Sequence, residues 1–272
     1  MSDPQLRILV IGAHPDDCDI KAGGIAIKYA SLGHHVRFVS VTNGDAGHHE
    51  MGGIQLARRR RAEAESAGAM AGIEYHVMDN HDGELEPTLE NRKKIIRMIR
   101  SYTPDLILTH RPNDYHPDHR YTSILVQDSA YMVCVPNVCT DVAPLTHNPT
   151  IVYLSDGFQK PTPFAPDIVV DIDDVVEKKL DMLHCHTSQM YEWLPWIAGN
   201  LDEVPEGNAE RRRWLEHRLD RFIGVADTYR EKLIELYGEE QGSQVKHAEG
   251  FEACEYGGNL DESNIRRLFP FI

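Results

Sequence analysis

The sequence predicts an α/β fold: a Rossmann-like, doubly wound, mostly parallel sheet with helices on both faces and a C-terminal helical elaboration. In the first half, short β-branched runs alternate with longer helical patterns, which is typical of βαβ units. Strand-like runs such as ILVI and LILT are continuously apolar, as expected when helices cover both faces of a parallel sheet. After Asp173 the pattern becomes mainly helical.

The first half supplies the expected parallel core. Its first strand reads RILVIG, and the second reads HVRFVSVT, which is rich in the β-branched residues that strands favour. Between the strands, apolar residues recur at helical spacing, and the second helix carries a heavily charged face. In chain order, we expect strands over 7–12, 35–42, 75–78 and 105–110, and helices over 21–32, 55–71 and 89–102.

The second half begins with two more expected strands, 151–154 and 168–172, separated by a loop whose three prolines exclude it from a central strand. Helical patterns follow over 175–186 and 209–238. Between these helices, the segment 191–207 holds two tryptophans and two prolines, and we expect a loop. We expect one catalytic domain over 1–272, with an α/β core over 1–172 and a mainly helical elaboration over 173–272.

Composition excludes several classes of partner. The net charge of -15, from 43 acidic and 28 basic residues, would repel nucleic acid and anionic lipid. No stretch approaches the roughly 20 apolar residues of a bilayer crossing, and no basic segment precedes an apolar run at the start. We therefore expect a cytoplasmic protein without nucleic-acid or membrane partners. The five scattered cysteines include no C-x-x-C pair, which argues against a disulfide framework and a thiolate zinc site.

A first polar cluster, Gly12-Ala13-His14-Pro15-Asp16-Asp17, follows the first expected strand directly. Ligands of open α/β sheets bind outside the carboxyl ends of the strands, so this turn is a candidate site. A nucleotide-binding turn would need the pattern G-x-G-x-x-G, whereas this turn offers an imidazole and two carboxylates. Its chemistry therefore suits a cation.

A second cluster follows the strand over 105–110 and reads RPNDYHPDH over 111–119. A catalytic zinc usually keeps three protein ligands and one open position, and His119 can supply a ligand from this cluster. A single loop histidine is usually solvated, and an aspartate before a helix is usually an N-cap. Two such clusters at two strand ends favour a metal site instead.

The segments A-H-P-D-D at 13–17 and H-P-D-H at 116–119 resemble the two signatures of the PIG-L/LmbE-like deacetylases. The resemblance spans most of the chain and is strong to about Gln189. Further segments similar to the family occur in the expected order: TNGDAG at 42–47, Arg60-x-x-Glu63, Asp82-Gly83, HTSQ at 186–189 and AEGF at 248–251.

This resemblance implies a Rossmann-like hydrolase that holds one Zn²⁺ per chain. It implies removal of the N-acetyl group from a small-molecule substrate, an N-acetylglucosamine-type amino sugar or its conjugate. The family also allows a homo-oligomer, because related enzymes often self-associate. By position, the resemblance implies His14, Asp17 and His119 as zinc ligands, Asp16 as general base, His116 near the oxyanion and leaving amine, and Asp118 as the charge partner of His116.

Three further residues are candidates for substrate binding. Arg60 could hold a substrate hydroxyl or phosphate, or it could belong to a solvated arginine-rich helix face paired with glutamates. Asp45 could meet sugar hydroxyls or serve a turn. The resemblance places His186 at the pocket. We expect no second metal site at His184-Cys185-His186, because residues two apart on a helix face different sides.

Other functions stay open at this point. The same zinc site could serve an amidase or deacylase acting on a non-sugar amide or ester, since zinc chemistry does not identify the substrate. A nucleotide-binding module is disfavoured because His and Asp replace the Gly-rich turn, and a non-catalytic interaction protein is disfavoured because every residue that the chemistry requires is present. The segments 48–53 and 191–207 are candidates for setting substrate choice.

Overall fold

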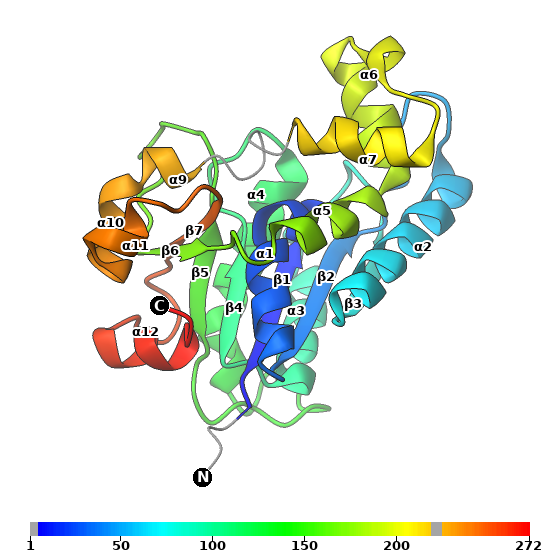
Figure 1. Cartoon of the computed structure of the whole chain (residues 1–272). Helices are drawn as coiled ribbons and strands as arrows, with labels where there is room; N and C mark the ends of the chain where they lie inside the picture. The colour runs from blue at the N-terminus through cyan, green and yellow to red at the C-terminus, as the bar shows by residue number, and fades with distance from the viewer. Residues whose placement is uncertain (1–4, 219–224) are drawn as a thin grey trace.

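The computed structural model describes residues 5–218 and 225–272. Within them, seven strands form one sheet in the order β3-β2-β1-β4-β5-β7-β6 (Figure 1). The first five strands pair in parallel, and β7 is antiparallel to both of its neighbours. The mostly parallel α/β sheet expected from the sequence is confirmed. The strands are β1 (Arg7–Gly12), β2 (His35–Thr42), β3 (Glu74–Asn80), β4 (Leu106–Thr109), β5 (Thr150–Leu154), β6 (Ile168–Asp171) and β7 (Ala248–Ala253).

Both faces of the sheet are covered by helices. Successive side chains of a strand point to opposite faces, so Ile8 and Val10 of β1 join one core cluster, while Leu9 and Ile11 join the other. The first cluster packs against α1 (Asp17–Ser31), α2 (Gly53–Ala71) and α5 (Val176–His184). The second packs against α3 (Leu89–Tyr102) and α4 (Pro117–Ala130). Figure 1 shows α1 and α5 on the near face and α3 on the far face.

The segment 191–207 is not the loop that its prolines predict. It contains most of η2 (Gln189–Trp193), which is a π-helical turn, followed by α6 (Leu194–Ala198) and η3 (Leu201–Glu203). Pro195 lies in the first turn of α6, where its missing N–H leaves no intrahelical bond unmade. The sequence prediction was wrong here because it took a helix-starting proline for a helix breaker.

The C-terminal part is helical with one exception. Its helices are α7 (Asn208–Glu216), α9 (Val225–Thr228), α10 (Arg230–Tyr237), α11 (Glu239–Gly242) and α12 (Glu262–Leu268). The expected helix over 209–238 is thus divided, and its residues 219–224 lie outside the described part of the chain. The exception is β7, which enters the sheet between β5 and β6. A C-terminal strand therefore completes the sheet that begins with β1.

A buried ion pair joins this strand to α1. Glu249 of β7 and Lys179 of α5 are almost fully buried, and their charged atoms lie 2.7 Å apart. The Glu249 carboxylate accepts the backbone N–H groups of Gly24 and Ile25, each at 2.8 Å. The Lys179 ammonium donates to the carbonyl of Ile20 at 2.8 Å. The pair thus bonds backbone groups in the middle of α1, close to the turn that carries the first polar cluster.

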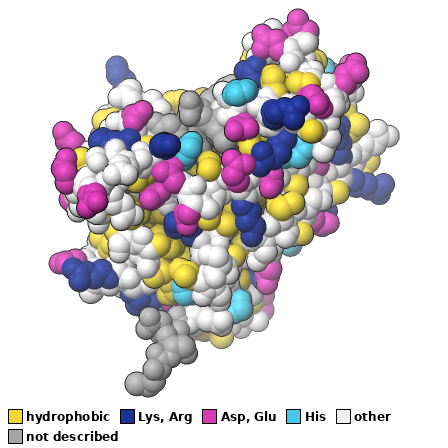
Figure 2. Space-filling model, viewed as in Figure 1, with side chains coloured by type: hydrophobic (Ala, Val, Ile, Leu, Met, Phe, Trp, Pro, Cys, Tyr) yellow, Lys and Arg dark blue, Asp and Glu magenta, His cyan; other side chains and the backbone are white. Residues whose placement is uncertain are grey.

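Charged side chains of both signs mix over the face seen in Figure 2, and acidic groups cover the tip of the projection that holds α6 and α7. None of the helices among the described residues combines the length and the apolar character needed to cross a membrane.

Candidate active site

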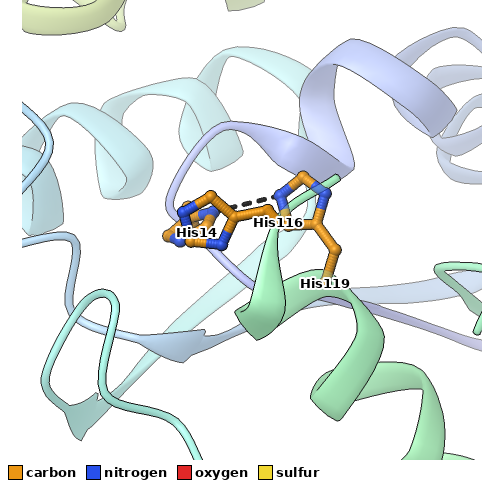
Figure 3. A group of neighbouring side chains, drawn as sticks. All are labelled: His14, His116 and His119. Carbon is orange, nitrogen blue, oxygen red and sulfur yellow. Dashed lines mark hydrogen bonds between the residues drawn. The ribbon is translucent and has the colours of Figure 1, made fainter. Parts of the chain in front are cut away.

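The sheet order brings the two polar clusters together. Strands β1 and β4 are parallel neighbours in which Ile11 pairs with Thr109, so the loops after them leave the same edge of the sheet. His14 lies in the turn between β1 and α1, whereas His116 is the N-cap of α4 and His119 lies in its first turn. Figure 3 shows the three histidines grouped together, with a dashed line that joins the rings of His14 and His119.

Three donor atoms form a nearly equilateral triangle. His119 Nε2 lies 3.2 Å from His14 Nδ1. Asp17 Oδ2 lies 3.3 Å from His14 Nδ1 and 3.4 Å from His119 Nε2. Around a tetrahedral zinc with bonds of about 2.0–2.1 Å, neighbouring ligand atoms are about 3.3–3.4 Å apart. The three residues that the sequence selects therefore fit a zinc ion, with a fourth position left for water or substrate.

Other donors crowd this triangle. The described residues hold three overlapping groups that could bind a metal: His14, His116 and His119; Asp17, His110 and His119; and His14, Asp82 and Asp118. The backbone N–H of Ala13 lies 3.1 Å from both His110 Nε2 and Asp17 Oδ2, and these two acceptor atoms are 3.3 Å apart. Its ring stacks on that of His119, with centroids 4.1 Å apart. His110, which the sequence analysis missed, therefore packs against the ring of His119.

Carboxylates lie behind both histidines of the triangle. Asp82 Oδ1 lies 3.1 Å and Asp118 Oδ2 lies 3.4 Å from His14 Nε2. Asp114 Oδ1 lies 3.1 Å from His119 Nδ1. Such carboxylates favour the proton on the ring nitrogen that they face, which leaves His14 Nδ1 and His119 Nε2 free to bind metal. Asp114 also escaped the sequence analysis, although it stands five residues before His119.

The charge balance of this cluster favours a cation. Burial lowers the pKa of His14, but Asp118, Asp17 and Asp82 outweigh it and raise that pKa well above its usual value. Burial raises the pKa of Asp17, but His119 and His110 bring it well below its usual range. Burial also raises the pKa of Asp82, but the hydrogen bond to His14 outweighs it and lowers that pKa to about 2. The carboxylates thus stabilise positive charge at their centre.

Asp16 and Arg60 form a buried pair beside the triangle. Arg60 Nη2 donates to Asp16 Oδ1 at 3.0 Å and to the carbonyl of Pro15 at 3.2 Å. Burial raises the pKa of Asp16 to about 6, although Arg60 opposes this shift. Arg60 is 2% exposed, whereas Arg58 and Arg61 are exposed. A solvated helix face is therefore the wrong interpretation of Arg60, which orients Asp16.

Asp118 does not pair with His116 as the resemblance implies. Its carboxylate accepts the backbone N–H of Gly83 at 2.7 Å and that of Leu85 at 3.3 Å, and it lies near His14. The contact with His116 runs instead from the backbone N–H of Asp118 to His116 Nδ1, at 3.2 Å. Burial, together with His14 and His119, lowers the pKa of His116.

Two of the candidate substrate-binding residues do not reach the site. His186 is fully buried, and its Nε2 lies 3.1 Å from Asp19 Oδ1. Asp45 Oδ2 lies 2.6 Å from His81 Nδ1, and Asp45 Oδ1 accepts the backbone N–H of Asp82 at 3.0 Å. Neither side chain is among those that line the cavity, and the Asp45 carboxylate is bonded to the loop at His81 and Asp82. A substrate contact by Asp45 or His186 therefore stays a prediction of the sequence.

The site opens into a cavity of about 360 Å³. Its floor is polar and holds the three triangle residues with Asp16, Arg60, Asp82 and His116. Its apolar wall comes from η2 and α6 and is formed by Trp193, Leu194 and Ile197. Gln189 also lines the cavity and donates to the carbonyl of Gly47 at 3.0 Å. A cavity that combines a few polar groups with an apolar wall is typical of a small-molecule site.

Comparison with known proteins places this site in a family. A diacetylchitobiose deacetylase of Thermococcus kodakarensis is 33% identical over 202 residues, which are 70% of this chain and 74% of that protein. The family described as PIG-L, GlcNAc-PI de-N-acetylase, matches residues 9–130, a segment that includes both polar clusters. The chain belongs to the PIG-L family.

Two further proteins are similar to this chain. The N,N'-diacetylchitobiose deacetylase of Pyrococcus horikoshii superposes with a TM-score of 0.71 at 26% identity, covering 92% of this chain and 84% of that one. A 4-oxalmesaconate hydratase of Pseudomonas putida is 24% identical over 71% of this chain and 78% of its own length. Membership of the PIG-L family confirms the resemblance carried by the two signatures and, with the deacetylase relatives, the expected amide hydrolase.

Proposed function

We propose that this PIG-L protein is a zinc-dependent deacetylase that removes the N-acetyl group from an N-acetylglucosamine-type sugar or its conjugate. One zinc ion per chain would be held by His14, Asp17 and His119. The observation that carries the proposal is the triangle of their donor atoms, with edges of 3.2, 3.3 and 3.4 Å, at the floor of the cavity. The acetylated sugar substrates in the relatives' names support the choice of substrate class.

Zinc bound there supplies Lewis-acid activation of the amide carbonyl and of the attacking water. Asp16 accepts the proton of that water and carries it towards the departing amine, while Arg60 holds the carboxylate in place. His116 accepts the N–H of Asp118 at Nδ1, so a neutral ring carries its proton on Nε2. That N–H can donate to the carbonyl oxygen as negative charge develops on it.

Arg60 and Asp82 are our candidates for holding the sugar. Both line the cavity, and Arg60 Nη1 lies 3.7 Å from Asp82 Oδ2. A guanidinium and a carboxylate side by side can donate to one sugar hydroxyl and accept from another. Asp118 supports catalysis by holding His14 and the backbone at Gly83. A cytosolic location and self-association stay predictions of the sequence.

The test is acetate release from free and conjugated N-acetylglucosamine compounds by protein stripped of metal and then resupplied with zinc. We expect release only after zinc is added, and one zinc per chain by elemental analysis. His119→Ala is the matched control, because it should lose both zinc and activity. Binding of zinc without acetate release from any sugar would contradict the proposed substrate, and activity in the stripped protein would contradict the metal assignment.

A further inference from the structure

A second cavity, of about 270 Å³, adjoins the first one at the triangle. Four residues line both cavities: Asp17, Ile20, Tyr115 and His119. The first cavity also includes residues 46–47 after β2 and 82–83 after β3, whereas the second includes residues 155–158 after β5. Because the sheet order is β3-β2-β1-β4-β5, the two cavities lie on opposite sides of the triangle along the carboxyl edge of the sheet (Figure 1).

Lys21 of α1 presents a cation to the second cavity. It stands four residues after Asp17, so both side chains lie on the same face of the helix. Its ammonium makes no hydrogen bond and no ion pair with any residue that the structure describes, whereas Lys28 on the same helix pairs with Asp174. Burial, together with the charge of Lys179, lowers the pKa of Lys21, although nearby carboxylates oppose this shift. An anion in the cavity would supply the missing partner.

The other charged groups of the second cavity have partners. Arg111 Nη1 donates to Asp156 Oδ1 at 3.0 Å, and Asp114 Oδ1 lies 3.1 Å from His119 Nδ1. Asp17 is the carboxylate that we propose as a zinc ligand, so the metal would cancel its charge. With Zn²⁺ counted at the triangle, positive charge exceeds negative charge among the described residues of the lining, which attracts a small anion.

A scissile amide at the triangle has substituents on two sides. Its nitrogen carries the sugar, which we place over Arg60 and Asp82 in the first cavity. Its carbonyl carbon carries the acyl group, which therefore points towards the second cavity. Hydrolysis adds water across the C–N bond and leaves an amine on the sugar and a carboxylate on the acyl side. The second cavity exceeds the needs of an acetyl methyl group, since a water of similar size takes about 30 Å³ in the liquid.

We propose that the second cavity binds a carboxylate on the acyl side of the scissile amide and that Lys21 is its partner. Two sources supply this chemistry: the acetate released by deacetylation, and the far end of a longer acyl group such as succinyl. Charge-assisted hydrogen bonds are roughly twice as strong as neutral ones, so Lys21 favours a carboxylate over an alkyl end.

This proposal rests on the proposed function, and its test separates the two. Isothermal titration calorimetry measures succinate binding to zinc-stripped protein, where neither the metal nor turnover contributes. With zinc restored, kcat/KM is measured for N-acetyl-, N-succinyl- and N-butanoylglucosamine, together with inhibition by acetate. Butanoyl is the neutral chain with as many carbons as succinyl. The variants are Lys21→Met and Lys21→Arg, with Lys28→Met as the matched control, because Lys28 lies on the same helix and lines neither cavity.

We expect Lys21→Met to weaken succinate binding and acetate inhibition by about 10- to 100-fold, the usual worth of a hydrogen bond to a charged group. Lys21→Arg should retain most of both, and Lys28→Met should change neither. If the wild type prefers N-succinyl to N-butanoyl and Lys21→Met loses this preference, the occupant is the end of a longer acyl group. If the wild type has no such preference, the occupant is the released acetate.

Unchanged succinate affinity in Lys21→Met, or an equal loss in Lys28→Met, would overturn the proposal. Urea denaturation checks that each variant folds, and Lys21→Arg tests the charge if Lys21→Met does not. If the wild type cleaves none of the three amides, the proposed function fails, and calorimetry still decides the cavity: succinate affinity that is independent of Lys21 overturns the anion site, and affinity that depends on Lys21 supports it.

Discussion

The floor and the wall of the cavity differ in how they are built. Most of the floor comes from two short segments, 13–17 and 116–119, each of which follows a strand of the parallel core, and Arg60 and Asp82 complete it. The wall comes from η2 and α6, which are held by contacts with residues more than 100 positions away, such as that between Gln189 and Gly47. Residue type and strand order are enough to bring the two segments of the floor together, whereas the wall depends on distant packing. We therefore expect changes in the floor to affect the chemistry on every substrate, and changes in the wall to affect the choice among substrates.

Asp16→Asn is expected to have the largest effect. The amide keeps the shape and the contact with Arg60 but cannot accept a proton, so kcat should fall by about 10²–10⁴-fold. Zinc content and KM should change little. The measurement is kcat on two different acetylated sugars, together with elemental analysis. A loss of kcat on only one of the two sugars would mean that Asp16 acts in substrate choice and not as the general base.

Lys179→Met tests how much the buried ion pair with Glu249, which is bonded to α1 beneath the floor, contributes to stability. The substitution leaves the Glu249 carboxylate buried without its cation, which should lower the free energy of unfolding by about 3–5 kcal/mol in urea denaturation. Lys178→Met is the matched control, because Lys178 is an exposed neighbour on the same helix and should cost about 0.5 kcal/mol or less. Equal stability of the two variants would show that β7 does not brace α1.

Asp114→Asn tests whether the carboxylate next to His119 contributes to zinc binding at the floor. The carboxylate behind His119 favours the ring tautomer that leaves Nε2 free, so its loss should weaken zinc binding by about 10–100-fold. Competition with a chromophoric chelator gives the affinity. Asp128→Asn serves as control, since Asp128 pairs with Arg92 at the surface. Unchanged zinc affinity in Asp114→Asn would remove Asp114 from the site.

Glu192→Ala should have the smallest effect. It removes the partner of Arg59 and His48, a half-exposed contact worth about 1 kcal/mol or less, so KM should rise by up to about fivefold at an unchanged kcat. Steady-state kinetics on a sugar conjugate checks this. The comparison variant is Glu90→Ala, which breaks an exposed pair with Lys94. A fall in kcat in Glu192→Ala would mean that wall and floor do not act separately.

The sequence alone predicted most of the fold and selected the three residues whose donor atoms form the triangle. Apolar strands and amphipathic helices are local patterns, and the bounds of β1, β2 and α3 agree with the structure. In the second half, the sequence analysis missed β7 and took a helical segment for a loop. A short strand between two others is stabilised by its neighbours rather than by its own residues, so its local pattern is weak.

Within the site, the sequence by itself determined which residues lie at the ends of β1 and β4, because parallel neighbouring strands place their following loops at one edge. The tertiary structure decided the partners of those residues. The Asp118 carboxylate lies near His14 rather than His116. His186 is buried against Asp19, and Arg60 forms an ion pair with Asp16. Contacts between charged groups depend on separations of about 3 Å, and packing between distant segments sets such separations, which local sequence does not encode.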